Sequence, residues 1–283
     1  MAGCQTRAGR AASHVIVPGM PLTSPHNPRV RAAARLRERR GRPAAGLTLV
    51  EGADELALAL AAGVRLTTIF LCPELIRPAS AGLRAHWPAE TEVVEVTPAV
   101  FARLAYRENP DGWLAVAPLP GRKLDDLSLP QARPPLLLVC EAVEKPGNLG
   151  AMLRTADAAG ADALLVCDPA TDLGNPNVIR ASRGAIFTVP VALTTTAAAL
   201  AWLKAHDVAI VAATPQAERR FTDVDLRGPV ALAVGAEDAG LSDLWLRAAD
   251  LTVRIPMTGR VNSLNVAASA ALLLYEAVRQ RGR

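Results

Sequence analysis

The chain has 283 residues, enough for one large domain or two modest ones; 51% of them are apolar and only 4% are aromatic. No apolar run reaches the ~18 residues of a membrane-spanning helix, which argues against a transmembrane segment. The net charge of +4 is unevenly placed, because residues 1–42 hold nine arginines and one acid. This basic segment on a mildly acidic body predicts a local contact with a polyanion, although a solvated arginine-rich helix face gives the same pattern.

The N-terminal part of the chain predicts a leader followed by a small α/β domain. Residues 1–24 contain Arg and Ser but no acid and no apolar h-region. We therefore expect residues 1–26 to be a disordered leader, with a transit-type peptide as the alternative. Residues 27–118 alternate between helical and strand patterns. The expected elements are a basic helix 28–40, a strand 46–52, a helix 53–62, strands 66–71 and 92–96, a helix 98–105 and a strand 113–118.

Residues 119–134 form a linker rich in proline and polar residues, and 135–283 form a second domain. This domain opens with 136-LLLVC-140, a continuous apolar run typical of a strand buried on both faces. Its alternating pattern predicts a mostly parallel sheet flanked by helices. The expected elements are strand 136–140, helix 148–159, strand 163–167, helix 176–183, strands 208–213 and 230–235, helix 242–249, strand 251–255 and a long helix 264–278.

The cysteine pattern indicates whether the chain binds a metal ion and in which redox compartment it resides. Cys4, Cys72, Cys140 and Cys167 are far apart and form no C-x-x-C pair, which argues against a metal site and a disulfide framework. Two of them lie in apolar runs that predict buried strands. Buried free thiols favour a reducing, cytoplasmic compartment.

Three loops at the carboxyl ends of predicted parallel strands carry polar residues, and open α/β sheets bind ligands at this edge. In the first, 141-EAVEKPGNLGAMLRTADAAGAD-162, a Pro and two Gly build a tight turn into a helix that carries Asn148 and Arg154. Taken alone, Asn148 is an ordinary cap and Arg154 an ordinary surface residue. The loop matches neither Walker A nor G-x-G-x-x-G, which argues against a nucleoside-triphosphate or dinucleotide site.

The second loop, 234-VGAEDAGLS-242, places Glu237 between Gly235 and Gly240. The two glycines allow a sharp turn or a close approach of backbone to a ligand. By itself, Glu237 would be an exposed loop carboxylate or an acid that favours a helix N-terminus.

The third loop leads from apolar Ile255 and Met257 into the last helix. Ser263 is a common helix cap, which predicts that the helix begins directly after it. Asn265 would then lie in the first turn, where Asn is a poor helix former, and capping alone does not explain this residue.

Together the three loops resemble the signature motifs of the SpoU (TrmH-type) RNA 2′-O-ribose methyltransferases of the SPOUT superfamily. The matching residues read N-x-G-x-x-x-R-T-A, G-x-E-x-x-G-L-S and I-P-M-x-G-x-x-x-S-L-N, in this order within residues 134–283. Residues 28–118 resemble, more loosely, the family's N-terminal substrate-binding domain, with LVEG as the best marker. Lys145 departs from the family, whose first motif often has an acid there. We expect this change to alter RNA contacts and to leave the core residues untouched.

The resemblance implies a trefoil knot, which no composition argument predicts, and S-adenosylmethionine as the cofactor. The cofactor-binding residues that it implies are Thr214, Gly235, Gly240, Ile255, Met257, Ser263 and Leu264. The catalytic residues that it implies are Asn148, Arg154, Glu237, Ser263 and Asn265. Asn265 would then accept a poor helical position because the site uses its side chain.

Methyl transfer needs an electrophilic methyl group, an in-line 2′-hydroxyl and removal of its proton. The family's proposed key residue corresponds to Arg154 and is sometimes described as the base. A guanidinium stays protonated in proteins and is a poor base, whereas it binds phosphate in a bidentate manner. We expect Arg154 to hold the target nucleotide's phosphate, and the other motif residues to order this arginine and the loops around it.

The predicted activity is S-adenosylmethionine-dependent 2′-O-ribose methylation of RNA. 23S ribosomal RNA is preferred, because a separate RNA-binding domain suits a large folded RNA. A transfer-RNA ribose methyltransferase and a non-catalytic RNA-binding protein stay as alternatives, and the sequence does not separate a housekeeping role from antibiotic resistance. The resemblance also implies a homodimer, with Leu272, Leu273, Leu274 and Tyr275 in the core, the interface or both.

Overall fold

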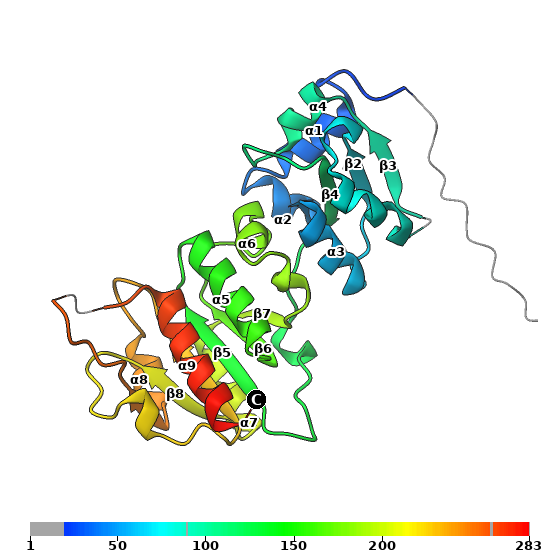
Figure 1. The fold of residues 1–283 in the computed structure, drawn as a ribbon. Coiled ribbons are helices and arrows are strands. Elements are labelled where there is room, and N and C mark those ends of the chain that lie inside the picture. The colour runs from blue at the N-terminus through cyan, green and yellow to red at the C-terminus, as the bar shows by residue number, and fades with distance from the viewer. Residues whose placement is uncertain (1–19, 89, 261–262, 283) are drawn as a thin grey trace, which may run out of the picture.

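The computed structural model describes residues 20–88, 90–260 and 263–282, which form an N-terminal and a C-terminal sheet with helices packed around each (Figure 1). The N-terminal strands are β1 (Leu47–Glu51), β2 (Thr68–Leu71), β3 (Glu92–Glu95) and β4 (Trp113–Pro118). Their order is β1-β4-β2-β3, where β4 runs antiparallel to both neighbours and β3 is parallel to β2. The helices are α1 (Pro28–Arg35), α2 (Gly41–Ala45), α3 (Ala53–Ala61) and α4 (Pro98–Leu104), with 3-10 turns at Pro73–Leu75 and Pro78–His86.

Every strand pair in the C-terminal sheet of the described chain is parallel, which confirms the mostly parallel sheet predicted. Its strands are β5 (Leu136–Glu141), β6 (Ala163–Cys167), β7 (Val191–Thr194), β8 (Ala209–Ala213), β9 (Val230–Val234) and β10 (Leu251–Val253). The order is β10-β8-β9-β5-β6-β7. The helices are α5 (Pro146–Ala158), α6 (Pro176–Ala181), α7 (Thr196–Ala205), α8 (Asp243–Ala248) and α9 (Val266–Gln280), with 3-10 turns at Leu124–Asp126, Ala185–Phe187 and Phe221–Asp223.

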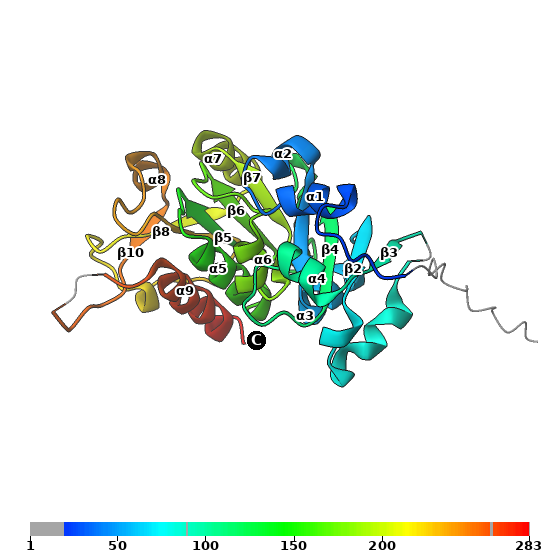
Figure 2. The same ribbon diagram turned by 90° about the horizontal axis from the view of Figure 1, so that it is seen from above.

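The side chains of β5 alternate between two apolar layers, because successive residues of a strand point to opposite faces. Leu136, Leu138 and Cys140 belong to the layer that contains α5 and α9. Leu137 and Val139 belong to the layer that contains α7 and α8. Figure 2 shows these helix pairs on opposite sides of the sheet. Burial on both faces accounts for the continuous apolar run of this strand.

The predicted basic helix near the N-terminus is wrong in extent, because α1 ends at Arg35 and a second short helix, α2, begins at Gly41. The Arg42 side chain donates hydrogen bonds of 2.9 Å to the carbonyl oxygens of both Leu36 and Arg37. A Cβ at Gly41 would lie 2.2 Å from the carbonyl oxygen of Arg35. The chain therefore turns back on itself here, and the close approach requires glycine.

Two elements, β7 and α7, lie where the sequence predicts none. β7 is a four-residue strand at the edge of the sheet, with Leu193 41% exposed, so its apolar pattern is weak. Thr195 caps α7 directly after the strand, and its Oγ1 accepts a hydrogen bond of 3.3 Å from the Ala198 N–H. No Gly or Pro separates the two elements, so the usual turn signal is missing.

The predicted leader is only partly within the described residues. Residues 1–19, which include Cys4, lie outside them. Leu22 forms a β-bridge with Val96, and its N–H donates a hydrogen bond of 2.8 Å to the Glu95 carbonyl. Paired backbone therefore begins before residue 27, the predicted start of the first domain.

Arg42 also joins the N-terminal part to the C-terminal part. Its Nε and Nη2 donate hydrogen bonds of 3.0 and 2.8 Å to the two carboxylate oxygens of Asp172, and the Arg42 side chain is only 2% exposed. Thr48 donates to the carbonyl of Gly174 in the same loop. A bidentate arginine–carboxylate pair fixes orientation as well as distance. The two sheets are thus held in one relative orientation.

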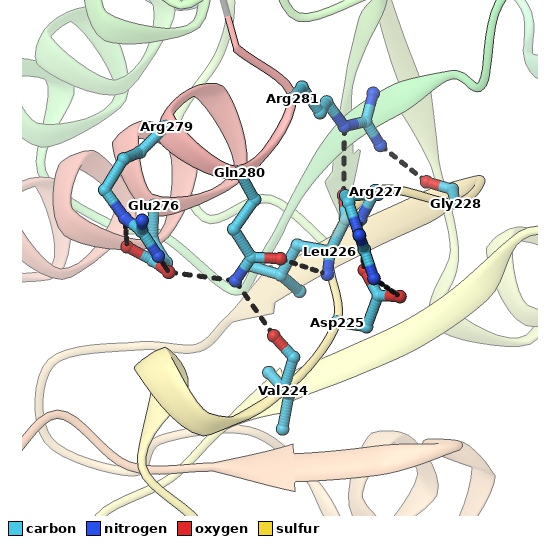
Figure 3. A network of polar contacts seen from close by, with 9 residues as sticks. All are labelled: Val224, Asp225, Leu226, Arg227, Gly228, Glu276, Arg279, Gln280 and Arg281. Atoms are coloured by element: carbon cyan, nitrogen blue, oxygen red, sulfur yellow. Dashed lines mark hydrogen bonds and ion pairs between the residues drawn. The ribbon is translucent and has the colours of Figure 1, made fainter.

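The C-terminal end of α9 is fastened to the segment 224–228 that precedes β9 (Figure 3). The Gln280 side chain accepts a hydrogen bond of 2.8 Å from the Leu226 N–H and donates one of 2.9 Å to the Val224 carbonyl. Arg281 Nε donates to the Leu226 carbonyl at 2.9 Å. These bonds fix the direction of α9 and so the position of its other end, where the third motif lies.

Candidate active site

A cavity of about 790 Å³ lies at the carboxyl ends of β8, β9 and β10. This is the edge at which open parallel sheets bind ligands, and the volume suits a molecule the size of a nucleotide cofactor. All seven residues predicted to bind the cofactor line it: Thr214, Gly235, Gly240, Ile255, Met257, Ser263 and Leu264. The fold therefore brings the second and third motifs around one space.

The loop after β9 folds tightly back on itself at the cavity wall. The Gly240 N–H donates a hydrogen bond of 3.0 Å to the Ala236 carbonyl, and Gly240 has a φ of +69°. A Cβ at Gly235 would lie 2.1 Å from both the carbonyl carbon and the oxygen of Gly240. Only glycine fits at Gly235, so backbone rather than a side chain forms this wall.

Three predicted catalytic residues, one from each motif, form a hydrogen-bonded network beside the cavity. Asn148 Nδ2 and Asn265 Nδ2 each donate a hydrogen bond of 2.8 Å to Glu237 Oε1. Asn265 Nδ2 also lies 3.1 Å from Asn148 Oδ1 and donates to it. The network ties the start of α5, the loop after β9 and the start of α9 to one another.

Lys145 completes this network and corrects an expectation. Its ammonium forms an ion pair with Glu237 Oε2. The hydrogen bonds from Lys145 and Asn148 hold the pKa of Glu237 below its ordinary 4.5, and the same ion pair raises the pKa of Lys145. The expectation that Lys145 leaves the core residues untouched is wrong, because the residue contacts one of them directly.

Asn265 is the helix cap, so the predicted start of the last helix is wrong. Its Oδ1 accepts a hydrogen bond of 3.0 Å from the Ala267 N–H, and α9 begins at Val266. Ser263 and Leu264 precede the helix and face the cavity. Asn is among the best N-cap residues, so its position breaks no local rule. Its side chain caps with the carbonyl oxygen and binds Glu237 with the amide nitrogen.

Arg154 lies apart from this network. It follows Asn148 by six residues on α5, which places it about 9 Å further along the helix axis and about 120° around it. Its side chain is exposed and forms no hydrogen bond or ion pair with the rest of the described chain. The other motif residues therefore order the loops around the cavity, and do not contact this arginine.

Glu141, which the motifs do not include, anchors the cavity loop to the sheet. Its carboxylate, 7% exposed at the end of β5, accepts hydrogen bonds of 2.7 and 2.8 Å from the Ser242 N–H and hydroxyl. It also accepts one of 2.9 Å from Thr196, whose hydroxyl accepts one of 3.1 Å from the Trp245 indole. A carboxylate directly after a fully apolar strand was the available sequence signal.

The described ranges contain no cluster of three or more His, Cys, Asp or Glu side chains that could hold a metal ion. No helix in the same ranges has the length and apolar content needed to cross a membrane. The polar side chains that line the cavity are Thr214, Gln216, Glu237, Asp238, Asp243, Ser263 and Ser269.

The chain belongs to the SpoU rRNA methylase family. The model of that family matches residues 135–275, and the model of the MRM3-like substrate-binding domain matches residues 27–115. The chain is 34% identical over 257 residues to the 23S rRNA (uridine(2479)-2′-O)-methyltransferase of Streptomyces viridochromogenes, with 88% of each chain covered.

Two solved structures extend the similarity to the whole fold. A crystal structure of an RNA 2′-O ribose methyltransferase has a TM-score of 0.83 and 44% identity, and the match covers 93% of this chain and 100% of that chain. The AdoMet-bound rRNA methyltransferase of Sinorhizobium meliloti has a TM-score of 0.83 and 30% identity, covering 92% of this chain and 97% of that chain.

Proposed function

We propose that this protein transfers a methyl group from S-adenosylmethionine to a ribose 2′-hydroxyl of ribosomal RNA, with 23S ribosomal RNA as the substrate. The observation that carries the proposal is the network of Asn148, Glu237 and Asn265, which joins three separate segments beside one cavity. Family membership supports it, as do the names of the Streptomyces relative and the cofactor-bound neighbour.

The residues around the cavity fit S-adenosylmethionine. Met257 and Leu264 are 37% and 38% exposed beside Ile255, and together they offer apolar surface to an adenine ring. Apolar side chains grouped at a cavity are typical of a ligand site. The loop 235–240 and Thr214 offer backbone groups to the polar parts of the molecule. When bound, the cofactor supplies an electrophilic methyl group, and the chain's residues orient it and keep water away.

We assign Arg154 to the target nucleotide. Its guanidinium is exposed, with its donors available to a ligand, and it can bind one phosphate through two parallel hydrogen bonds. Holding that phosphate would orient the neighbouring ribose toward the cavity. Arg154→Lys keeps the charge and loses the planar fork, so we expect methylation to fall sharply while cofactor affinity stays unchanged. Full activity in this variant would show that charge alone is sufficient.

A homodimer is supported by the outer face of α9. Ala268, Leu272 and Tyr275 recur at helical spacing on one face, and the last two are 41% and 50% exposed, whereas Leu273 and Leu274 are fully buried in the core. We expect a dimer by sedimentation equilibrium, and a monomer when Leu272 and Tyr275 are both changed to Glu. A dimer that survives both substitutions would place the interface elsewhere.

A trefoil knot and a cytoplasmic location are further parts of the proposal. The knot is supported by the path of the chain, since β10 is at one edge of the sheet and α9 then returns to pack on α5. The location is supported by the free thiols of Cys72 and Cys140, whose pKa values burial raises to about 11 and about 12. Such thiols stay protonated and unreactive.

The first experiment is S-adenosylmethionine binding by calorimetry. Wild type and Gly235→Trp are compared, with Gly228→Trp at the other end of β9 as a control, because a Cβ there meets no atom within 4 Å. We expect binding by wild type and the control and none by Gly235→Trp. Mapping of 2′-O-methylation on ribosomal RNA follows. Folded wild-type protein that binds no cofactor, even with RNA added, would leave an RNA-binding protein as the better account.

A further inference from the structure

Two arginines are directly paired at the end of β10. Arg220 and Arg254 form a parallel β-bridge. The Arg254 N–H donates a hydrogen bond of 2.8 Å to the Arg219 carbonyl, and the Arg254 carbonyl accepts one of 3.0 Å from the Phe221 N–H. Residues paired in this way stand about 4.8 Å apart, with their side chains on the same face of the ladder. The two guanidinium groups therefore extend from adjacent points of one surface.

The bridge lies on the outer side of β10, away from its neighbour β8. The Val253 carbonyl accepts a hydrogen bond of 2.9 Å from the Thr214 N–H, on the side of β8. The N–H of the same trans peptide belongs to Arg254 and points the opposite way. Segment 219–221 consequently runs along the outer side of β10, and both arginines are exposed there.

This pairing lacks a counter-ion within the described part of the protein. Like charges directly opposite one another in a ladder are unfavourable. Neither Arg220 nor Arg254 forms a side-chain hydrogen bond or ion pair with another described residue, and the nearby acids Glu218 and Asp223 form no ion pair with them. Two like charges held together without a partner point to an anionic ligand from outside the chain.

The pair is close in sequence to residues that line the cavity, and neither arginine is itself part of the lining. Arg254 directly precedes Ile255, which lines the cavity, and Gln216 lines it on the segment that leads to Arg220. A ribose that enters the cavity carries phosphates on both sides, so the RNA backbone extends past the cavity lining onto the neighbouring surface. The exposed face of α9, where we place the subunit contact, is apolar, whereas the surface at this bridge carries two positive charges.

We propose that Arg220 and Arg254 bind the phosphate backbone of the RNA beside the target nucleotide. The inference rests on the proposed function for the position of the target, and on the paired charges for the contact itself. Each guanidinium can bind a phosphate through two parallel hydrogen bonds. The pair would act with Arg154, so that the backbone is held at two places.

The test is the salt dependence of RNA binding. A short fluorescein-labelled oligouridine is titrated by anisotropy at several salt concentrations with wild type, Arg220→Ala, Arg254→Ala and the double variant. For single strands the slope of log K against log salt becomes shallower by about 0.7 for each phosphate that a variant no longer binds. We expect that change for each single variant and about twice as much, ~1.4, for the double variant. The Lys variants at both positions should keep the wild-type slope.

The control is Arg227→Ala, an exposed arginine near the opposite, amino end of β9, whose partner is Asp225. Its slope should equal that of wild type, and cofactor affinity should be unchanged in every variant. An unchanged slope in the double variant would overturn the inference even if wild type methylates RNA. A double variant that becomes monomeric with an unchanged slope would assign the pair to the partner subunit, and would also overturn it. Because RNA binding is measured directly, a failure of methylation would count against the proposed function alone.

Discussion

The side chain of Asn265 donates a hydrogen bond of 2.8 Å to Glu237 Oε1 while it accepts one of 3.0 Å from the Ala267 N–H. One residue thus begins α9 and holds the carboxylate that joins the three motif segments. The helix start and the network depend on the same amide group, so a change at Asn265 separates the two roles only if it keeps the carbonyl oxygen.

Asn265→Asp keeps the capping oxygen and removes the amide donor, and it places a second negative charge beside Glu237. We expect cofactor affinity and methylation to fall strongly, because the loop after β9 loses its tie to α9. Asn265→Ala loses both the amide donor and the capping oxygen. Loss of the cap alone should lower its free energy of unfolding by ~1 kcal/mol relative to wild type. Calorimetry and urea unfolding on both variants measure the two effects. An unchanged free energy of unfolding in Asn265→Ala would contradict the capping role.

The Lys145–Glu237 pair predicts how cofactor affinity varies with pH. The pKa of Glu237 in the folded protein is lowered from 4.5. The stabilisation that the ionised carboxylate gives to the network is therefore complete above that value and is lost as pH falls through the lowered pKa. The pKa of Lys145 in the folded protein is raised from 10.5. The stabilisation that its ammonium gives to the network is therefore present below that value and is lost as pH rises through the raised pKa. We expect affinity to be flat between these limits.

The matched control for this pH profile is Glu237→Gln, which cannot titrate. Its cofactor affinity should be lower than that of wild type, and the decrease on the acid side should disappear. An acid decrease of the same size in Glu237→Gln would assign the titration to another group.

Glu141→Gln tests the anchor of the cavity loop. The amide that replaces one carboxylate oxygen meets groups that donate, so at least one of the hydrogen bonds from Ser242 or Thr196 is lost. Hydrogen bonds to a charged group contribute about 2 kcal/mol each, so the free energy of unfolding should fall by about that amount. Cofactor affinity should fall with it, while oligouridine binding stays the same. A loss of RNA binding alone would contradict the anchoring role.

Arg42→Ala removes the buried side of the ion pair with Asp172 and leaves two carbonyl groups without their donor. Removal of one partner from a buried pair costs about 3 kcal/mol, so urea unfolding should show a decrease of that order. Arg227→Ala, at an exposed pair, should leave the unfolding curve unchanged. A similar small effect in both variants would show that the contact between the two sheets does not depend on Arg42.

The sequence predicts the parts of this fold that local pattern determines. The apolar run of β5 and the positions of the three loops at strand ends follow from local pattern and order. The second and third loops line the cavity, and the first lies beside it. The start of α9 does not follow from local pattern, because Ser263 and Asn265 are both good caps, and only the structure shows that Asn265 is the one used. The partners of Lys145 and Glu141 are found only in three dimensions, since they lie 92 and 101 residues away.

The contact of Arg42 with Asp172 has a consequence for the choice of target. With the two sheets locked together, the distance between the N-terminal surface and the cavity is constant. An RNA that contacts both the N-terminal surface and the cavity must span this fixed distance. The ribose that reaches the cavity would then be the one that the RNA's own fold presents at that distance. Selection of the nucleotide would depend on the shape of the RNA more than on the identity of its base.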